Sequence, residues 1–120
     1  MEKQNEDCIF CKISKGEIKS EKISENDNFF AVNDLHPVTK GHCLIIPKRH
    51  YKTMLDIPST LGGELLSIEK ETALKLMKKD KTIQGFNILM NNFNVAGQIV
   101  NHAHIHLIPR RKNDGFRVCS

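Results

Sequence analysis

Apolar side chains recur every three or four residues through the middle of the chain, with charged residues between them. This spacing puts the apolar positions on one helix face, so it predicts a single long helix that ends at Lys79. Ser59 or Thr60 is the expected N-cap, because a side-chain hydroxyl can accept a hydrogen bond from the first turn. Gly62 and Gly63 weaken that turn by about 1 kcal/mol each relative to alanine. The inward-facing positions are Leu61, Leu65, Ile68, Thr72 and Leu76.

Short runs of strand-forming residues lie on both sides of this helix. Residues 22–25 and 28–33 predict a hairpin, with an Asn-Asp-Asn turn between them. Residues 42–47 end in a continuous apolar run and predict a strand that is buried on both faces. Two more strands are expected, over residues 86–91 and 102–109.

The last predicted strand alternates histidine with apolar residues. Successive side chains of a strand point to opposite faces, so His102, His104 and His106 are expected on one face and Ala103 and Ile105 on the other, toward the core. A neutral imidazole is a nucleophile at physiological pH, which suits two-step phosphoryl or nucleotidyl transfer. The alternatives are chelation of one metal ion by all three histidines and a solvated histidine face.

Composition narrows the classes of protein to consider. The chain has 120 residues, 39% hydrophobic and 27% charged, which is typical of one globular domain. A net charge of +4 suits an anionic ligand, while one tyrosine and no tryptophan offer few surfaces for base stacking, so we expect neither nucleic acid nor a membrane as a partner. Residues 1–7 are acidic and polar, unlike a signal peptide. We expect a flexible tail over residues 1–7, a domain over residues 8–120 and a cytoplasmic location.

Residues 102–108 match a known signature. Their order, His-Ala-His-Ile-His-Leu-Ile, resembles the His-φ-His-φ-His-φ-φ pattern (φ, apolar) of the histidine triad (HIT) family of nucleotide hydrolases and transferases. Residues 8–13, 33–37, 41–50 and 97–98 are also similar to the family, in particular to its zinc-bearing bacterial type. The resemblance implies an α+β fold in which an antiparallel five-stranded sheet is backed by one long helix. It also implies a homodimer whose sheet continues between subunits.

The resemblance implies roles for the last two histidines. It makes His104 the nucleophile that attacks the α-phosphorus, and His106 a phosphate ligand that helps to protonate the leaving group. In the loop at Gly97 and Gln98, backbone N–H groups and the Gln98 amide are expected to neutralise developing charge on the phosphate, and Gly97 allows a close backbone approach. The implied catalytic residues are therefore His104, His106 and Gln98.

The resemblance also implies a nucleotide-binding set. Asp34 is expected at the ribose hydroxyls, Leu35 against the base and Asn91 on the phosphate side. Asp34 can equally be read as a turn-forming residue. Asn33 stands where the family often has a histidine. The full expected set is Asn33, Asp34, Leu35, Asn91, Gly97, Gln98, His104 and His106.

The activity implied by the resemblance is hydrolysis or transfer at the α-phosphate of purine nucleotides, such as nucleoside phosphoramidates or similar nucleotidyl conjugates, through a nucleotidyl-histidine intermediate. A dinucleoside polyphosphate hydrolase is the alternative within the family. A non-catalytic, nucleotide-sensing interaction protein is the alternative of a different class. Ile99 replaces the serine that some members carry, which leaves the leaving-group preference open. The basic C-terminal residues either hold the distal phosphates of a longer substrate or form a solvated face; they are Arg110, Arg111, Lys112 and Arg117.

A metal site is expected near the N-terminus. Residues 8–13 predict a single helical turn or knuckle, and within it Cys8 and Cys11 have the spacing of a zinc knuckle. His50 and His102 most simply complete a closed, structural Cys2His2 zinc site, and the zinc-bearing bacterial members are similar in this pattern. A redox dithiol and an inert buried pair of cysteines are the alternatives.

The remaining cysteines and histidines are assigned no chemistry. Cys43 is expected in the core, and Cys119 is expected to be an exposed thiol near a frayed end. His36 and His42 are interpreted as ordinary polar residues at turn and strand ends.

Overall fold

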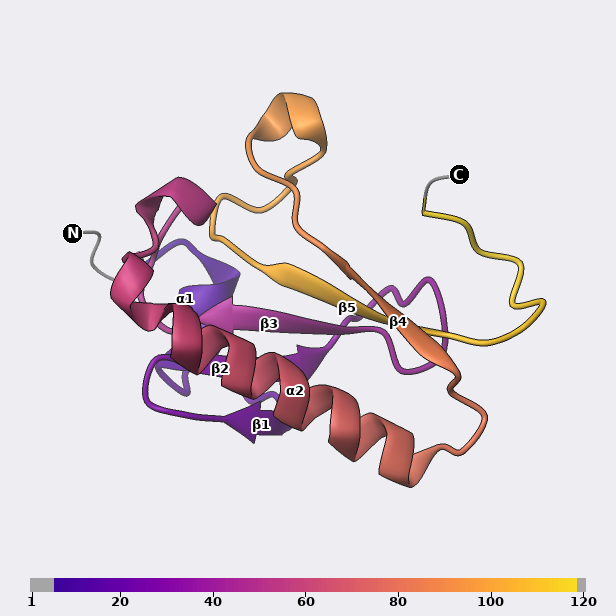
Figure 1. Cartoon of the computed structure of the whole chain (residues 1–120). Helices are drawn as coiled ribbons and strands as arrows, with labels where there is room; N and C mark the ends of the chain where they lie inside the picture. Colours follow the sequence, from indigo (N-terminus) through magenta and orange to yellow (C-terminus); the bar gives the residue numbers. More distant parts are fainter. Residues whose placement is uncertain (1–5, 119–120) are drawn as a thin grey trace.

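The computed structural model describes residues 6–118, so most of the expected tail and Cys119 lie outside the described residues. The chain forms a five-stranded antiparallel sheet of order β1-β2-β3-β5-β4, and the long helix α2 crosses one face of it (Figure 1). The predicted α+β class, five-stranded antiparallel sheet and single long helix are confirmed. The strands are β1 (Lys22–Glu25), β2 (Phe29–Asn33), β3 (Cys43–Pro47), β4 (Gly85–Leu89) and β5 (Ile105–Arg110). The helices are α1 (Ile9–Ser14) and α2 (Gly62–Lys79), with 3-10 helices η1 (Met54–Asp56), η2 (Ser59–Leu61) and η3 (Asn94–Ala96).

The β1–β2 hairpin forms at the predicted asparagine-rich turn. The side-chain oxygen of Asn26 accepts hydrogen bonds from the backbone N–H groups of Asn28 (3.3 Å) and Phe29 (2.9 Å). These bonds close the turn locally. The carboxylate of Glu64, in the first turn of α2, accepts two further 2.7 Å bonds from the backbone and side chain of Asn28. The hairpin is therefore tied to the start of the long helix.

The sheet separates two apolar clusters, and β3 contributes to both. Leu44 and Ile46 pack with the α1 side, whereas Cys43 and Ile45 pack with the α2 side. All of β3 is buried, which confirms the predicted two-sided strand and the core position of Cys43. The predicted inward face of α2 is confirmed as well, since its side chains join the second cluster or are buried beside it: Leu61, Leu65, Ile68, Thr72 and Leu76.

The start of α2 differs from the prediction. Ser59 and Thr60 belong to η2, which leads directly into α2 at Gly62. Leu61 occupies the N-cap position, and its apolar side chain cannot accept a hydrogen bond. The predicted cap at Ser59 or Thr60 was therefore wrong, because both residues already lie inside a helical turn.

Among residues 6–118, no helix combines the length and apolar character needed to cross a membrane.

β5 begins three residues later than predicted. Its pairing with β3 begins at Ile105, so His102 and His104 precede the strand. In this stretch the backbone N–H of Ala103 donates a 2.7 Å hydrogen bond to the carbonyl of Tyr51, in the loop after β3. His102 and His104 are therefore held by contacts outside the sheet ladder. β4 is also shorter than predicted, since it ends at Leu89.

Candidate functional site

The three alternating histidines divide between two neighbouring sites. His104 and His106 lie side by side, with ring centroids 5.2 Å apart. The ring of His102 instead packs edge-on against His50, at a centroid distance of 4.9 Å. The row expected from strand alternation is therefore broken at His102.

His104 has a defined tautomer. It is 8% exposed, and its Nδ1–H donates a 2.8 Å hydrogen bond to the backbone carbonyl of His102. A carbonyl oxygen can only accept, so the hydrogen of the neutral ring is on Nδ1 and the lone pair is on Nε2. Nε2 is therefore the nitrogen of this residue that can act as a nucleophile.

His106 has the opposite tautomer, which a chain of hydrogen bonds sets. The backbone N–H of Val38 donates to Nδ1 of His42 (3.1 Å), so the ring hydrogen of neutral His42 is on Nε2. That N–H donates to Nδ1 of His106 (2.9 Å), which leaves the hydrogen of neutral His106 on Nε2. His104 and His106 thus have a lone pair and an N–H, respectively, at their Nε2 atoms.

The surroundings of His42 and His106 keep these two rings neutral at pH 7. Burial, with smaller contributions from the adjacent His104 and His42, lowers the pKa of His106 to about 4. Burial also lowers the pKa of His42, against the opposing effect of the Asp34 carboxylate. The Oδ2 atom of Asp34 lies 3.4 Å from Nε2 of His42 and 4.0 Å from Nδ1 of His106. The tautomers deduced for His42 and His106 therefore apply at neutral pH.

His42 is a site residue that the sequence interpretation missed. The reading of His42 as an ordinary polar residue was wrong, because its ring is buried and bonded to His106. Its neighbour Leu44 pairs with His106 across the β3–β5 ladder, so His42 is a diagonal neighbour of His106. In the sequence, His42 stands two residues before Leu44. This position points to His106 once the pairing of β3 with β5 is known. His36 is exposed, as expected of a polar turn residue.

The loop after β4 is braced by the side chain of Gln98. Its amide nitrogen donates to the carbonyls of Lys52 (2.6 Å) and Val100 (3.0 Å), and its amide oxygen accepts from the N–H of Phe93 (2.7 Å). Both amide N–H groups are therefore used within the protein. This corrects the expectation that the Gln98 amide neutralises phosphate charge: the side chain is buried and supports the loop instead.

Gly97 and Asn91 lie together in the same loop. Gly97 has a φ of 96°, a conformation that favours glycine, and a Cβ at this position would be 3.7 Å from the Asn91 amide nitrogen. Leu89 pairs with His106 in the β4–β5 ladder. Asn91 follows two residues after Leu89, beyond the end of β4, and therefore lies at the level of His104. This register puts the loop beside the histidines, and contact of Gly97 or Asn91 with a phosphate stays a prediction.

The residues expected to bind the nucleoside lie at the end of β2. Asn33 is the last residue of β2, and Asp34 follows it next to the His42 ring. Asp34 also accepts a 2.8 Å bond from the backbone N–H of His36, so it does form the turn that the alternative reading proposed. The side chain of Leu35 is 82% exposed. Their contacts with a nucleotide stay predictions.

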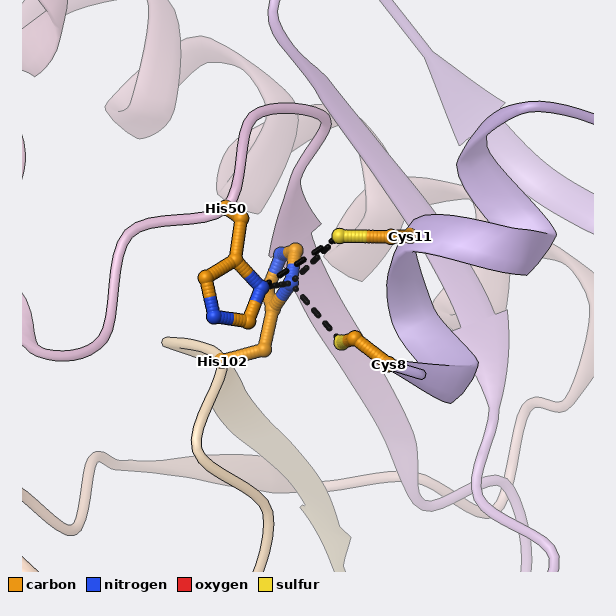
Figure 2. Close-up of side chains that lie close together, drawn as sticks. All are labelled: Cys8, Cys11, His50 and His102. Carbon is orange, nitrogen blue, oxygen red and sulfur yellow. Dashed lines mark hydrogen bonds between the residues drawn. The ribbon is translucent and has the colours of Figure 1, made fainter. Parts of the chain in front are cut away.

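Four buried donors converge on a second site, as Figure 2 shows. The ligand atoms of Cys8, Cys11, His50 and His102 all lie within 4.8 Å of one another. Sγ of Cys8 and Nδ1 of His102 are 3.3 Å apart, as are Sγ of Cys11 and Nδ1 of His50. The two Nδ1 atoms are 3.2 Å apart. We refer to these four residues as the Cys2His2 cluster.

The donor chemistry of the Cys2His2 cluster fits a tetrahedral metal. Nε2–H of His102 donates a 2.8 Å bond to the carbonyl of Pro47, so Nδ1, which faces the cluster, has the lone pair. Burial lowers the pKa of His102 to about 4, which keeps the ring neutral and able to ligate. Two thiol and two imidazole donors make a complete set for zinc, with no position left open.

The C-terminal arginines pair with carboxylates of the chain itself. Arg110 makes two hydrogen bonds of 2.7 and 2.8 Å to Asp114 and also donates to the carbonyl of Phe116. Arg111 donates to Asp80 (2.8 Å). The hydrogen bond from Arg110 holds the pKa of Asp114 well below the usual range, and hydrogen bonds from Thr82 and then Arg111 do the same for Asp80. Neither guanidinium therefore supports the expected role in binding distal phosphates, whereas Lys112 and Arg117 are exposed.

Comparison with known proteins assigns the family. The model of the HIT domain family matches residues 15–113. The chain belongs to the HIT family. This HIT protein is 40% identical over 108 residues to the adenosine 5'-monophosphoramidase of Candida albicans, a match that covers 87% of this chain and 70% of the relative. It is 39% identical over 108 residues to the adenylylsulfatase of Arabidopsis thaliana, covering 90% of this chain and 54% of that protein.

A solved HIT structure provides a comparison for the metal centre. The crystal structure of a zinc-bound histidine triad family protein from Mycobacterium smegmatis matches this HIT protein with a TM-score of 0.84 at 32% identity. The match covers 92% of this chain and 80% of that chain. The HIT domain match begins at residue 15, so Cys8 and Cys11 lie before the part of the chain that it covers.

Proposed function

We propose that this HIT protein is a nucleotide hydrolase or transferase that acts at the α-phosphate of purine nucleotide conjugates, with His104 as the nucleophile. The observation that carries the proposal is the pair of opposite Nε2 groups on adjacent rings, a lone pair on His104 and an N–H on His106. One nitrogen can attack phosphorus while the other donates to a phosphate oxygen. The relatives named as an adenosine 5'-monophosphoramidase and an adenylylsulfatase support a nucleotide substrate.

The proposed reaction has two steps. In the first, the Nε2 lone pair of His104 forms a bond to the α-phosphorus, and the bond from phosphorus to the leaving group breaks. The leaving group departs with that electron pair and takes up the Nε2 proton of His106, which donates a hydrogen bond to the phosphate before the transfer. In the second step, water attacks phosphorus, the bond from phosphorus to Nε2 of His104 breaks with its electron pair returning to the nitrogen, and the proton released by water returns to Nε2 of His106. The net reaction consumes one water molecule.

The nucleoside is proposed to bind over the end of β2, at Asn33, Asp34 and Leu35. A purine base that covers the Leu35 side chain, which is 82% exposed, removes apolar surface from water. The Asp34 carboxylate can accept hydrogen bonds from ribose hydroxyls on the same side as the His42 ring. The phosphate then faces the histidine pair and the loop that contains Asn91 and Gly97.

A nucleoside phosphoramidate is the preferred substrate class. A dinucleoside polyphosphate hydrolase is the second candidate within the family, and it needs cations for the distal phosphates. Arg110 and Arg111 are paired with Asp114 and Asp80, so the observed ion pairs favour the shorter substrate. A non-catalytic nucleotide sensor is the alternative of a different class.

Turnover and affinity measured on one variant separate an enzyme from a sensor. Wild type and His104→Ala are compared for hydrolysis of adenosine 5'-phosphoramidate and for binding of AMP by calorimetry. The proposal expects turnover in the wild type, at least about a thousandfold less in the variant, and similar AMP affinity in both. AMP binding without turnover in the wild type would favour the sensor.

We also propose that the Cys2His2 cluster binds zinc as a structural ion. A bound zinc ion, with its charge balanced by the two thiolates, would crosslink α1 to the segments before β5 and after β3. The support is the burial of all four donors, the tautomer of His102 and the zinc-bound relative. The role is structural because four protein ligands leave no position for substrate.

A homodimer is proposed as the form in solution, in a cytoplasmic setting. β4 is an edge strand with an exposed Ile88, so its free edge can continue the sheet into a second copy. The long helix also exposes large apolar side chains, namely Leu66, Leu74 and Met77. Sedimentation of the wild type and of Ile88→Lys tests this, since a charged edge residue should shift the mass toward a monomer.

A further inference from the structure

Phe10 lies between the two sites that the histidines form. It is in α1, between Cys8 and Cys11, and it is buried in the apolar cluster on that side of the sheet. Its ring makes edge contacts with His102 (centroids 5.6 Å apart, interplanar angle 87°) and with His104 (5.2 Å, 64°). One side chain of α1 therefore touches both a donor of the Cys2His2 cluster and the proposed nucleophile.

His102 forms a second connection between the same two sites. Its side chain belongs to the Cys2His2 cluster, and its backbone carbonyl accepts the Nδ1–H of His104 at 2.8 Å. This hydrogen bond keeps the lone pair of His104 on Nε2. Whatever fixes the His102 side chain therefore also restrains the carbonyl that sets the tautomer of His104.

The position of His104 depends on these contacts because the sheet ladder does not extend to it. Pairing of β5 with β3 begins at Ile105. The preceding segment is held by the bond from Ala103 to Tyr51, the bond from the His102 ring to Pro47 and the packing of Phe10. Loss of order in α1 would remove the packing contact and loosen the His102 ring.

We propose that Phe10 is a positioning residue, which together with the His102 carbonyl makes the orientation of His104 depend on metal binding by the Cys2His2 cluster. The proposal rests on the proposed function, in which His104 is the nucleophile. Metal binding fixes Cys8 and Cys11 at the start of α1, and this holds the Phe10 ring against the imidazole of His104. The Cys2His2 cluster takes no part in the chemistry itself. Metal binding to it thereby controls the rate at which His104 attacks the α-phosphorus.

The first test compares two Phe to Leu variants of the same apolar cluster. Phe10→Leu removes the ring contact with His104, while Phe30→Leu removes a fully buried ring from the same cluster and serves as the matched control. The rate of nucleotidyl-enzyme formation is measured at saturating adenosine 5'-phosphoramidate, so that affinity does not enter. We expect a loss of about 10- to 100-fold for Phe10→Leu and less than about threefold for Phe30→Leu. Equal losses would overturn the proposal.

The second test is independent of the chemistry and uses the wild-type chain. The Nδ1–H of His104 is followed by NMR in protein labelled with 15N histidine, with zinc bound, after chelation and after zinc is restored. We expect its protection from exchange to fall at least about tenfold on chelation and to recover with zinc. Unchanged protection in the folded, metal-free protein would overturn the proposal. Zinc-loaded Phe10→Leu should retain its metal and still show reduced protection.

The two proposals fail in different ways. If the wild type forms no nucleotidyl adduct, the proposed function fails, and the exchange measurement still decides whether the Cys2His2 cluster controls His104. If the adduct forms at one rate with and without zinc, and protection is also unchanged, the coupling is wrong and the proposed function stands.

Discussion

The Nε2–H of His42 donates a 2.9 Å hydrogen bond to Nδ1 of His106, and this bond defines the tautomer of His106. His42 itself is oriented by the backbone N–H of Val38. The consequence is an N–H at Nε2 of His106, beside a lone pair at Nε2 of His104. The chemistry proposed for this site depends on that pair of opposite groups.

Replacing His42 with alanine should lower turnover without removing the nucleophile. Without the His42 donor, His106 can place its hydrogen on either nitrogen, so a fraction of molecules lacks the Nε2–H that is proposed to donate to the phosphate. We expect kcat to fall by about 10- to 100-fold. His36→Ala is the control, because His36 is exposed in the same loop. Equal kcat values for His42→Ala and the wild type would contradict the relay.

The stability of the protein should decrease as the pH falls through the range from about 6.5 to about 4. The pKa of His106 is lowered to about 4 by burial, so in this range the unfolded chain binds a proton that the folded chain does not. The free energy of unfolding should therefore drop on acidification, by at most about 3 kcal/mol for this residue. Urea denaturation at pH 7 and pH 4.5 measures the change.

The comparison that isolates His106 is a variant without the titrating ring. His106→Asn should lose less stability than the wild type between the two pH values, since contributions from groups that do not contact His106 cancel in the difference. Parallel losses in the two proteins would show that His106 is not held neutral by its surroundings.

Metal content should depend on one cysteine and not on another. Cys11→Ser should abolish stoichiometric zinc binding and lower the Tm, because Cys11 belongs to the Cys2His2 cluster. Cys43→Ala is the matched control: Cys43 is equally buried, and burial raises its pKa to about 12, which makes it a poor ligand. Elemental analysis should find one zinc per chain in the wild type and in Cys43→Ala. A wild type that is purified without chelator and lacks zinc would contradict the site.

Gln98→Glu should lower the stability of the protein by disturbing the loop after β4. The substitution turns the amide nitrogen, which donates to the carbonyls of Lys52 and Val100, into an oxygen that repels them. We expect a loss of about 1–3 kcal/mol in the free energy of unfolding, measured with urea. A variant that is as stable as the wild type yet inactive would show instead that the Gln98 amide contacts the substrate.

The parts of the fold that could be predicted depend on short-range patterns. The hairpin around Asn26, the two-sided burial of β3 and the inward face of α2 follow from spacing within a few residues. The grouping of Cys8 and Cys11 with His50 and His102 could be anticipated because few side chains ligate zinc. The cap of α2 could not, since a hydroxyl near a helix start is a cap only if its own backbone is outside the helix.

The features that were missed depend on register and on long-range contacts. His42 became a site residue because β3 and β5 pair with Leu44 opposite His106. Gln98 lost its expected role because the carbonyl of Lys52, 46 residues away, accepts its amide hydrogen. Neither the pairing of β3 with β5 nor the contact between Gln98 and Lys52 can be read from the spacing of nearby residues. Functional groups were therefore easier to recognise than the partners that decide what each of them does.

The most direct test of the central claim is the intact mass of the protein after brief mixing with adenosine 5'-phosphoramidate. The account predicts a transient mass increase of one adenylyl group in the wild type, located on His104 by peptide analysis and absent from His104→Ala. A parallel reaction with diadenosine tetraphosphate compares the two substrate classes. Turnover with no adduct, or an adduct that persists in His104→Ala, would contradict the assignment of His104 as the nucleophile.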